Sequence, residues 1–225
     1  MPKEQNENGF TAERVAEALR REVLEGALRA DDRIKDNDLV ARFAISRNTA
    51  REALRLVSSE GLVVLRLHSG ATVRRLELDD IVDIFRVRRT IECTAVLASS
   101  RAPESLFTAA ELAVQRAEVH LDQEHWAEAG TASLQFHEAI VALHGSPRLS
   151  RLFAQQVAQL RTAFWVLPVQ SEFQARYIVR DREIIDLLLG GRREKAALEL
   201  TQYLDDSEAN LLDAYRAAAR AAGSS

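Results

Sequence analysis

The stretch at residues 45–57 constrains this chain more than any other part of its sequence. Ser46 is a typical helix N-cap. The residues after it place small and branched apolar side chains on one helical stripe, namely Ala50, Ala53, Leu54 and Val57. Basic side chains recur every four residues on another stripe, at Arg47, Arg51 and Arg55. The pattern predicts an amphipathic helix whose basic face points away from an apolar core.

A second short helix is predicted directly before this one, at residues 36–43. Its apolar side chains, Leu39, Val40 and Phe43, would pack on the apolar stripe across a tight turn. Two short helices joined in this way form a helix-turn-helix, whose second helix presents its first residues to base edges in the major groove of DNA. Arg47, Asn48 and Arg51 occupy that end. Arginine can grip guanine and asparagine can grip adenine, and a good pair discriminates by about 1–3 kcal/mol.

A β-hairpin is predicted after the basic helix. Gly61 can end the helix in a left-handed conformation, and residues 63–67 form a β-branched run typical of a strand. Residues 68–70 are typical of a turn, and residues 71–73 of a return strand. A row of arginines by itself is usually a solvated helix face. A hairpin wing after a helix-turn-helix favours DNA binding instead.

These motifs together resemble the winged-helix signature of the GntR superfamily of bacterial transcription regulators. The resemblance rests on residues 46–54, 60–63 and 70–73, in matching order and spacing. It implies that DNA is contacted by the start of the basic helix, by the helix before it and by the tip of the wing. The residues are Asn37, Ser46, Arg47, Asn48, Thr49, Arg51, His68 and Gly70. His68 and Gly70 would enter the minor groove, and Asn37 would lie near the DNA backbone.

The chain departs from the family pattern at two places. Asp31-Asp32 stands where the family usually has Pro-Gly before the second helix, and Asn48-Thr49 stands where it commonly has Thr-Pro. The winged helix is expected to form in spite of both changes, with an unusual base preference.

Composition indicates two domains in a protein of the reducing cytosol. The chain has 225 residues, of which 47% are hydrophobic, and one cysteine, Cys93, which excludes an intramolecular disulfide framework. Apolar runs are too short to cross a membrane, so we expect a cytoplasmic protein without membrane partners. Residues 1–76 hold 14 Lys and Arg against 12 Asp and Glu, whereas the whole chain has a net charge of −4. Basic charge is therefore concentrated in the part that would bind phosphates.

The fold class expected is mainly α: an N-terminal winged helix-turn-helix with a small β-hairpin wing, followed by an all-α six-helix bundle. Residues 1–10 read as a disordered tail, residues 11–76 as the winged helix and residues 79–221 as the bundle. Helical periodicity and Gly or Pro punctuation place the bundle helices at about 80–99, 104–122, 126–144, 147–167, 171–190 and 192–221, the first capped by Asp79.

Six helices after a winged helix resemble the FadR branch of the same superfamily. Its C-terminal domain, of the FCD type, is an all-helical bundle that binds an effector and dimerises. Residues 88–92 are similar to the first-helix signature of this domain, and residues 136–140 followed by 146–149 are similar to its central one.

Many members of this branch hold a divalent metal with an aspartate and three histidines. Of these four ligands this chain keeps only one, His137. It has Ser133 at the position of the aspartate, and Asp181 and Tyr203 at the positions of the other two histidines. An imidazole-rich metal site is therefore not expected, and His137 with Asp181 are weak candidates for binding an ion.

A polar pocket is still expected inside the bundle. Polar residues at positions that would face its middle are Arg88, His137, Arg161, Asp181 and Tyr203. Two arginines and a histidine suit a small anionic effector, such as a carboxylate or phosphate. The alternative is that Arg88 pairs with Glu92 or Asp181 and that His137 is a hydrogen-bonded core histidine, and the sequence leaves both open.

Three classes of function can be compared. The first is a ligand-responsive regulator, a repressor, that binds a palindromic operator as a homodimer. The second is a helical adaptor that uses its arginine face on an acidic partner protein. The third is an enzyme, against which the sequence shows no nucleophile and base pair, phosphate loop or paired carboxylates. The sequence favours the first.

Overall fold

The computed structural model describes residues 11–66, 70–164 and 170–222. The chain forms two compact units that divide after Arg75. The expected tail at residues 1–10 and the wing-tip residue His68 lie outside the described residues. Each unit is described below by itself.

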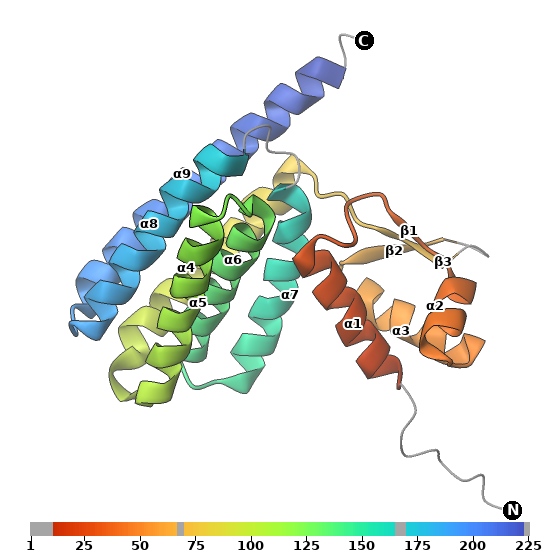
Figure 1. Ribbon diagram of the computed structural model, residues 1–225, viewed down its shortest axis with the longest axis horizontal. Coiled ribbons are helices and arrows are strands. Elements are labelled where there is room, and N and C mark those ends of the chain that lie inside the picture. The colour runs from red at the N-terminus through yellow and green to blue at the C-terminus, as the bar shows by residue number, and fades with distance from the viewer. Residues whose placement is uncertain (1–10, 67–69, 165–169, 223–225) are drawn as a thin grey trace, which may run out of the picture. The chain divides into compact units, whose positions relative to one another are not determined.

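The first unit is a three-helix winged helix (Figure 1). Its helices are α1 (Ala12–Glu25), α2 (Asp36–Phe43) and α3 (Arg47–Ser59), and its strands are β1 (Arg33–Ile34), β2 (Val63–Arg66) and β3 (Gly70–Val73). The apolar stripe predicted for α3 is fully buried, at Ala50, Ala53, Leu54 and Val57. It packs against α1, which buries Val15, Leu19 and Val23, and against α2, which buries Leu39 and Phe43. The winged-helix prediction is confirmed.

The described strands form one antiparallel sheet in the order β1-β3-β2. The hairpin pairs Val63 with Val73 and Arg66 with Gly70. Strand β1 was not predicted, because two residues are too few to show a period-two pattern. It forms because Arg33 and Ile34 pair with Thr72 and Ala71 of β3, which buries Ile34.

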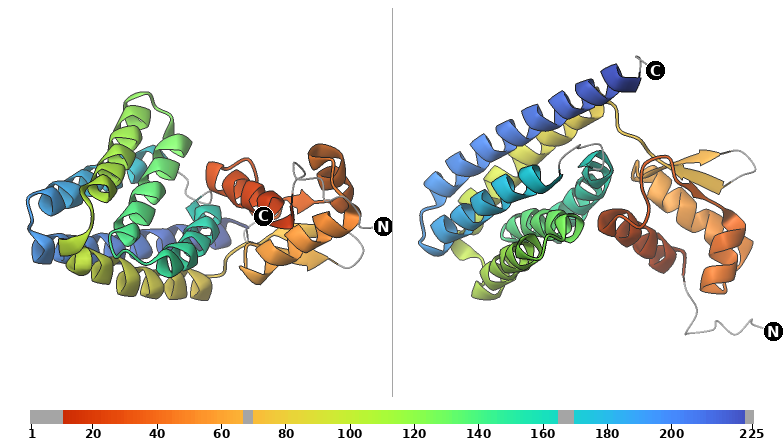
Figure 2. Two further views of the ribbon diagram at one scale, coloured as in Figure 1. Left: turned by 90° about the horizontal axis from the view of Figure 1, so that it is seen from below. Right: turned by 45° about the horizontal axis from the view of Figure 1, so that its top comes forward.

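The second unit consists of helices (Figure 2). In chain order these are α4 (Leu78–Ala98), the short 3₁₀ helix η1 (Ser99–Arg101), α5 (Glu104–Asp122), α6 (Trp126–Ala142), α7 (Pro147–Phe164), α8 (Gln170–Leu189) and α9 (Arg193–Ala222). Helix α6 contacts α4, α5, α7 and α8, while α9 lies along α4 and α8. The predicted bundle of six α-helices is confirmed for the described residues, and no helix end differs from the expected one by more than three residues.

The start of α4 differs from the expectation. Glu77, rather than Asp79, is the N-cap, and its side chain accepts a hydrogen bond from the backbone of Asp80. The carboxylate of Asp80 in turn accepts from the Glu77 backbone N–H at 3.0 Å. The prediction was wrong because this reciprocal capping box satisfies two backbone donors, whereas a single cap at Asp79 would satisfy one.

No helix among the described residues is long and apolar enough to cross a membrane.

Candidate nucleic-acid interface and bundle interior

Helix α3 begins with a pair of hydroxyl groups that fix its first turn. The Ser46 Oγ accepts a hydrogen bond from the Thr49 backbone N–H at 3.0 Å and lies 2.8 Å from the Thr49 Oγ1. Ser46 is thus the N-cap expected from the sequence. Because the cap holds the helix start in place, the side chains of Arg47 and Asn48 leave the first turn from a defined position, exposed to solvent.

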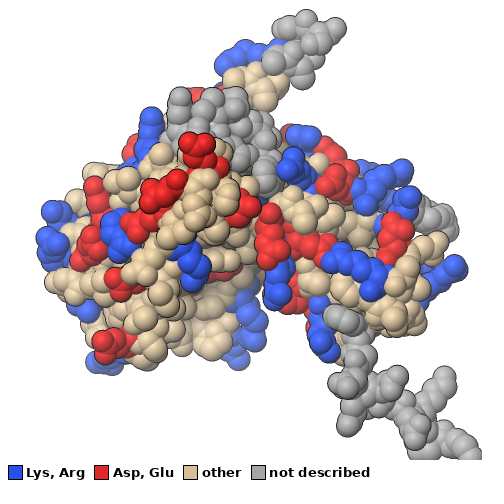
Figure 3. All heavy atoms as spheres, viewed as in Figure 1, with Lys and Arg blue, Asp and Glu red and all other residues tan. Residues whose placement is uncertain are grey.

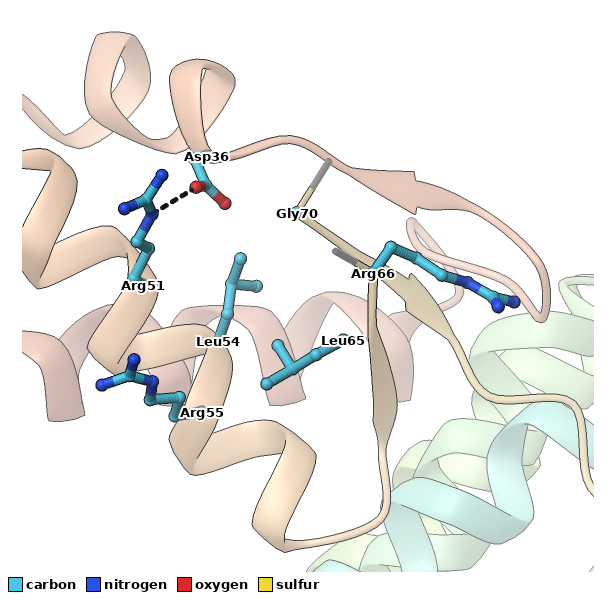
Figure 4. Close-up of a pocket in the computed structure, with 7 residues that line it drawn as sticks. All are labelled: Asp36, Arg51, Leu54, Arg55, Leu65, Arg66 and Gly70. Carbon is cyan, nitrogen blue, oxygen red and sulfur yellow. Dashed lines mark hydrogen bonds and ion pairs between the residues drawn. The ribbon is translucent and has the colours of Figure 1, made fainter. Parts of the chain in front are cut away.

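The basic face of α3 borders two hollows in the surface of the first unit. One, of about 400 Å³, is lined by Arg33, Lys35, Asp36, Asn37, Arg47, Arg51 and Gly70. The other, of about 240 Å³, is lined by Asp36, Arg51, Leu54, Arg55, Leu65, Arg66 and Gly70 (Figure 4). The structure therefore brings Asn37, Arg47, Arg51 and Gly70 together. It adds Arg33 and Lys35, which the sequence did not single out because they lie on an unpredicted strand and its end.

Three other arginines of the first unit are engaged in ion pairs with carboxylates of the same unit. Arg20 binds Glu60 with an Nη2 to Oε1 distance of 2.6 Å, Arg42 binds Glu22, and Arg75 binds Asp31. Acidic and basic side chains accordingly alternate over the face shown in Figure 3. Arg47 and Arg55 differ, because neither has an ion pair within the described part of the chain. Positive charge not neutralised by the protein itself is thus left on α3.

Gly70 has a structural role that is independent of DNA. Its φ is +84°, and a Cβ atom at this position would lie 2.1 Å from the backbone oxygen of Ile34. A side chain here would therefore separate β1 from β3. The glycine lets the wing strand approach β1 closely, and this brings the wing beside the basic face of α3.

The interior of the second unit contains a cluster of buried polar side chains centred on Glu92. This carboxylate is fully buried and accepts from Arg88 Nε at 2.7 Å and from His137 Nδ1 at 2.6 Å. The other ring nitrogen of His137 lies 3.0 Å from the Tyr203 hydroxyl. Ser133 donates to Asp181 at 2.6 Å, and the second oxygen of Asp181 lies 3.6 Å from His137 Nε2. Arg88 and His137 thus have the partners that the alternative interpretation of these residues required.

The two buried carboxyl groups differ in their acidity. Burial acts to raise the pKa of Glu92, but the charges of Arg88 and His137 outweigh it and leave this pKa lowered. For Asp181, burial outweighs the opposing charges of His137 and Arg88, and it raises the pKa from 3.8 to about 6. Burial also raises the pKa of Tyr203 well above its usual value, so this hydroxyl keeps its proton.

A small polar cavity of about 10 Å³ lies beside this cluster. It is lined by Arg88, Gly130, Ser133, Leu134, His137, Phe164, Phe173, Gln174, Tyr177, Tyr203 and Ser207. Two buried atoms of the cluster have no hydrogen-bond partner within the described residues: the Nη2 of Arg88, which lines this cavity, and the Oδ1 of Asp181, which is not among the lining residues. Arg161 is buried but is not among the residues that line the cavity. Its Nη2 donates to the Ala127 backbone oxygen at 3.0 Å.

The donor set does not suit a divalent ion. His137 is held at both ring nitrogens, by Glu92 and Tyr203. Ser133 and Tyr203 offer protonated hydroxyls, which are poor ligands beside imidazole and carboxylate. No group of three or more histidine, cysteine, aspartate or glutamate side chains in the described ranges could hold a metal ion.

The fold and these two sites define a class of protein, a winged-helix DNA-binding regulator with a helical sensor domain. Comparison with family models agrees: the model "Bacterial regulatory proteins, gntR family" matches residues 11–73, and the FCD domain model matches residues 83–206. The latter covers more than half of the chain. The protein therefore belongs to the GntR family of transcriptional regulators and carries an FCD domain.

Individual relatives extend this comparison. The crystal structure of a GntR protein from Rhodococcus sp. RHA1 is 32% identical, with a TM-score of 0.83, and covers 91% of this chain and 98% of that one. The Nta operon transcriptional regulator of Aminobacter aminovorans is 28% identical over 173 residues, 74% of this chain and 77% of the relative. The gluconate operon transcriptional repressor of Bacillus licheniformis is 30% identical over 132 residues, 58% of this chain and 54% of the relative.

Proposed function

We propose that this regulator is a cytoplasmic repressor that binds a palindromic operator as a homodimer. A small anion that binds inside the bundle would raise or lower its affinity for the operator. The observation that carries the DNA part is the exposed, capped start of α3, where Arg47, Asn48 and Arg51 project from a helix whose opposite face is buried. A two-fold dimer places two such helices on half-sites about one helical turn apart. The name of the gluconate relative supports repression.

The DNA-contacting residues divide into two roles. Arg47, Asn48 and Arg51 reach base edges from the first turns of α3. Asn37, Ser46 and Thr49 contact phosphates, since Asn37 lines the hollow beside Arg47 and the two hydroxyls surround the N-terminus of α3. His68 and Gly70 bring the wing to the minor groove.

The effector would bind at the cavity beside Arg88, His137 and Tyr203. The unpartnered Arg88 Nη2 is a charged donor suited to a carboxylate or phosphate oxygen, and Asp181 Oδ1 can accept from a donor on the same molecule. A cavity of about 10 Å³ holds no more than a single water molecule. Binding therefore requires the lining to open, and this rearrangement would shift the population of winged-helix placements. Arg161 would act only if that opening exposes it.

The first experiment selects a binding sequence from a random DNA pool with the full-length protein. The affinity for the selected duplex and for random DNA is then measured at two salt concentrations. A phosphate-binding regulator should weaken steeply with salt and prefer the selected duplex, by about a thousandfold or more. Equal affinity for both duplexes would overturn the proposal and favour the adaptor that binds an acidic protein.

The same titration tests Arg51. Arg51→Ala should weaken binding to the selected duplex by about 10- to 100-fold. Arg21→Ala is a matched control, because Arg21 is an exposed arginine on α1 of the same unit and lines neither hollow. An Arg51→Ala variant that kept full operator affinity would remove this residue from the contacts.

The effector part has its own test. Native mass spectrometry and metal analysis of gently purified protein should show a metal-free dimer, and a copurified organic anion would identify the effector class. A stoichiometric divalent ion would contradict the anion site. By linkage, operator DNA must change the affinity for the effector by the same factor as the effector changes operator binding.

A further inference from the structure

One acidic side chain lies among the basic residues of both surface hollows. Asp36, the first residue of α2, lines each of them and places its Oδ2 2.9 Å from Arg51 Nε (Figure 4). Its side chain is 20% exposed, whereas that of Arg51 is 61% exposed. The ion pair is thus anchored on the protein side at Asp36 and open to solvent at Arg51.

A carboxylate in this position opposes DNA binding in general. It adds negative charge beside Arg33, Lys35 and Arg47, where phosphates would approach. Acidic residues in the first turn of a helix are favourable because they face the positive end of the helix dipole. Asp38 already places such a charge in the first turn of α2. The helix dipole therefore does not by itself account for an acidic side chain at residue 36 that faces the hollows.

The geometry of the pair explains what the carboxylate can do. A guanidinium group carries five N–H donors in a planar fork. Asp36 accepts from the Nε of Arg51 at 2.9 Å, and neither terminal nitrogen of Arg51 donates to another group within the described residues. Those two nitrogens are the pair that can donate together to the O6 and N7 atoms of one guanine. Holding Nε also reduces the freedom that the long side chain must lose on binding.

We propose that Asp36 is a positioning residue that sets base specificity in this protein, because it holds Arg51 for a two-pronged contact with guanine while it weakens binding to DNA of any sequence. The inference rests on the proposed DNA-binding function and deepens it at the same site. It assigns to one carboxylate two effects of opposite sign, a gain at one base pair and a loss at every phosphate nearby.

The test compares Asp36→Asn with Asp38→Asn. Both variants remove one negative charge from the first turn of α2, but Asp38 is exposed and lines neither hollow. Affinities are measured for the selected duplex, for the duplex with its critical guanine replaced, and for random DNA. Asp36→Asn should bind random DNA more tightly and lower the preference for the guanine by about tenfold. Asp38→Asn should leave that preference within about twofold of the wild type.

A double variant separates positioning from an independent effect. If Asp36 acts through Arg51, adding Asp36→Asn to Arg51→Ala should not reduce the guanine preference any further. A further reduction in the double variant, or an equal loss of preference in Asp36→Asn and Asp38→Asn, would overturn the inference. A wild-type protein that selects no sequence would instead refute the proposed function, so the two failures can be told apart. Circular dichroism of each variant checks that the helices remain folded.

Discussion

The two units of this protein contain nearly the same ion pair in opposite surroundings. In the winged helix, Arg51 Nε lies 2.9 Å from Asp36, and the arginine is open to water. In the bundle, Arg88 Nε lies 2.7 Å from Glu92, and the two side chains are 2% and 0% exposed. The first arginine is therefore available to a partner. The second is part of the core, and its buried Nη2 has no hydrogen-bond partner in the described residues.

The difference shows how the surroundings of an ion pair determine its role. Water screens the exposed pair, so it adds little stability, and it leaves the terminal nitrogens of Arg51 open to a base or a phosphate. The buried pair has lost its hydration and depends on the matching geometry of Glu92, His137 and Tyr203. We therefore expect the exposed arginine, Arg51, to take part in DNA recognition, and the buried one, Arg88, to take part in effector binding.

The largest effect is expected from breaking the buried pair. Glu92→Gln leaves the Arg88 charge buried without a counter-charge, and we expect the bundle to lose about 3–5 kcal/mol of unfolding free energy. Both tryptophans, Trp126 and Trp165, belong to the second unit, so denaturant unfolding followed by tryptophan fluorescence reports on it selectively.

Glu118→Gln provides the control for this measurement. Glu118 binds Arg182 at 2.7 Å, but its side chain is 38% exposed. The expected loss is below about 1 kcal/mol. Equal losses in both variants would show that burial does not distinguish the two kinds of pair in this protein.

A second, intermediate effect concerns pH and Asp181. Its pKa is about 6 in the folded protein against 3.8 as the ordinary value, so the folded state binds the proton more tightly. The favourable contribution of the protonated form is complete below pH 3.8 and is lost as pH rises through 6. Two pKa units correspond to about 3 kcal/mol.

Asp181→Asn removes this titration and can still accept the hydrogen bond from Ser133. Relative to the wild type, the variant should gain bundle stability between about pH 4 and pH 6 and keep a constant advantage above about pH 7. Unfolding midpoints measured by fluorescence across this range check the sign. A wild type that gained stability over the variant with rising pH would contradict the assignment.

The smallest effect on stability is expected for the exposed pair. Arg51→Ala should change the unfolding free energy of the winged helix by less than about 1 kcal/mol, because water screens this pair. Hydrogen exchange at the α3 amides measures this locally. The comparison between the two pairs would fail if Arg51→Ala destabilised α3 as strongly as Glu92→Gln destabilises the bundle.

Local patterns in the sequence predicted the frame of both units. The N-cap at Ser46 and the buried stripe of α3 are contained within a few neighbouring residues, and a helix of this kind forms the same faces in any compact setting. The periodic segments after residue 77 gave six helices for the same reason. Strand β1 escaped prediction because its two residues are a strand only through their pairing with β3.

The same distinction between local pattern and tertiary contact applies to the two candidate sites. By itself, the sequence determined which side chains leave the basic face of α3 and which polar residues interrupt the apolar bundle, since both follow from the helical period. Only the tertiary structure decided the partners that come from other helices: Asp36 beside Arg51 across 15 residues, and Glu92 beside His137, 45 residues away. Contacts between separate helices depend on how those helices pack, and no local period encodes that packing.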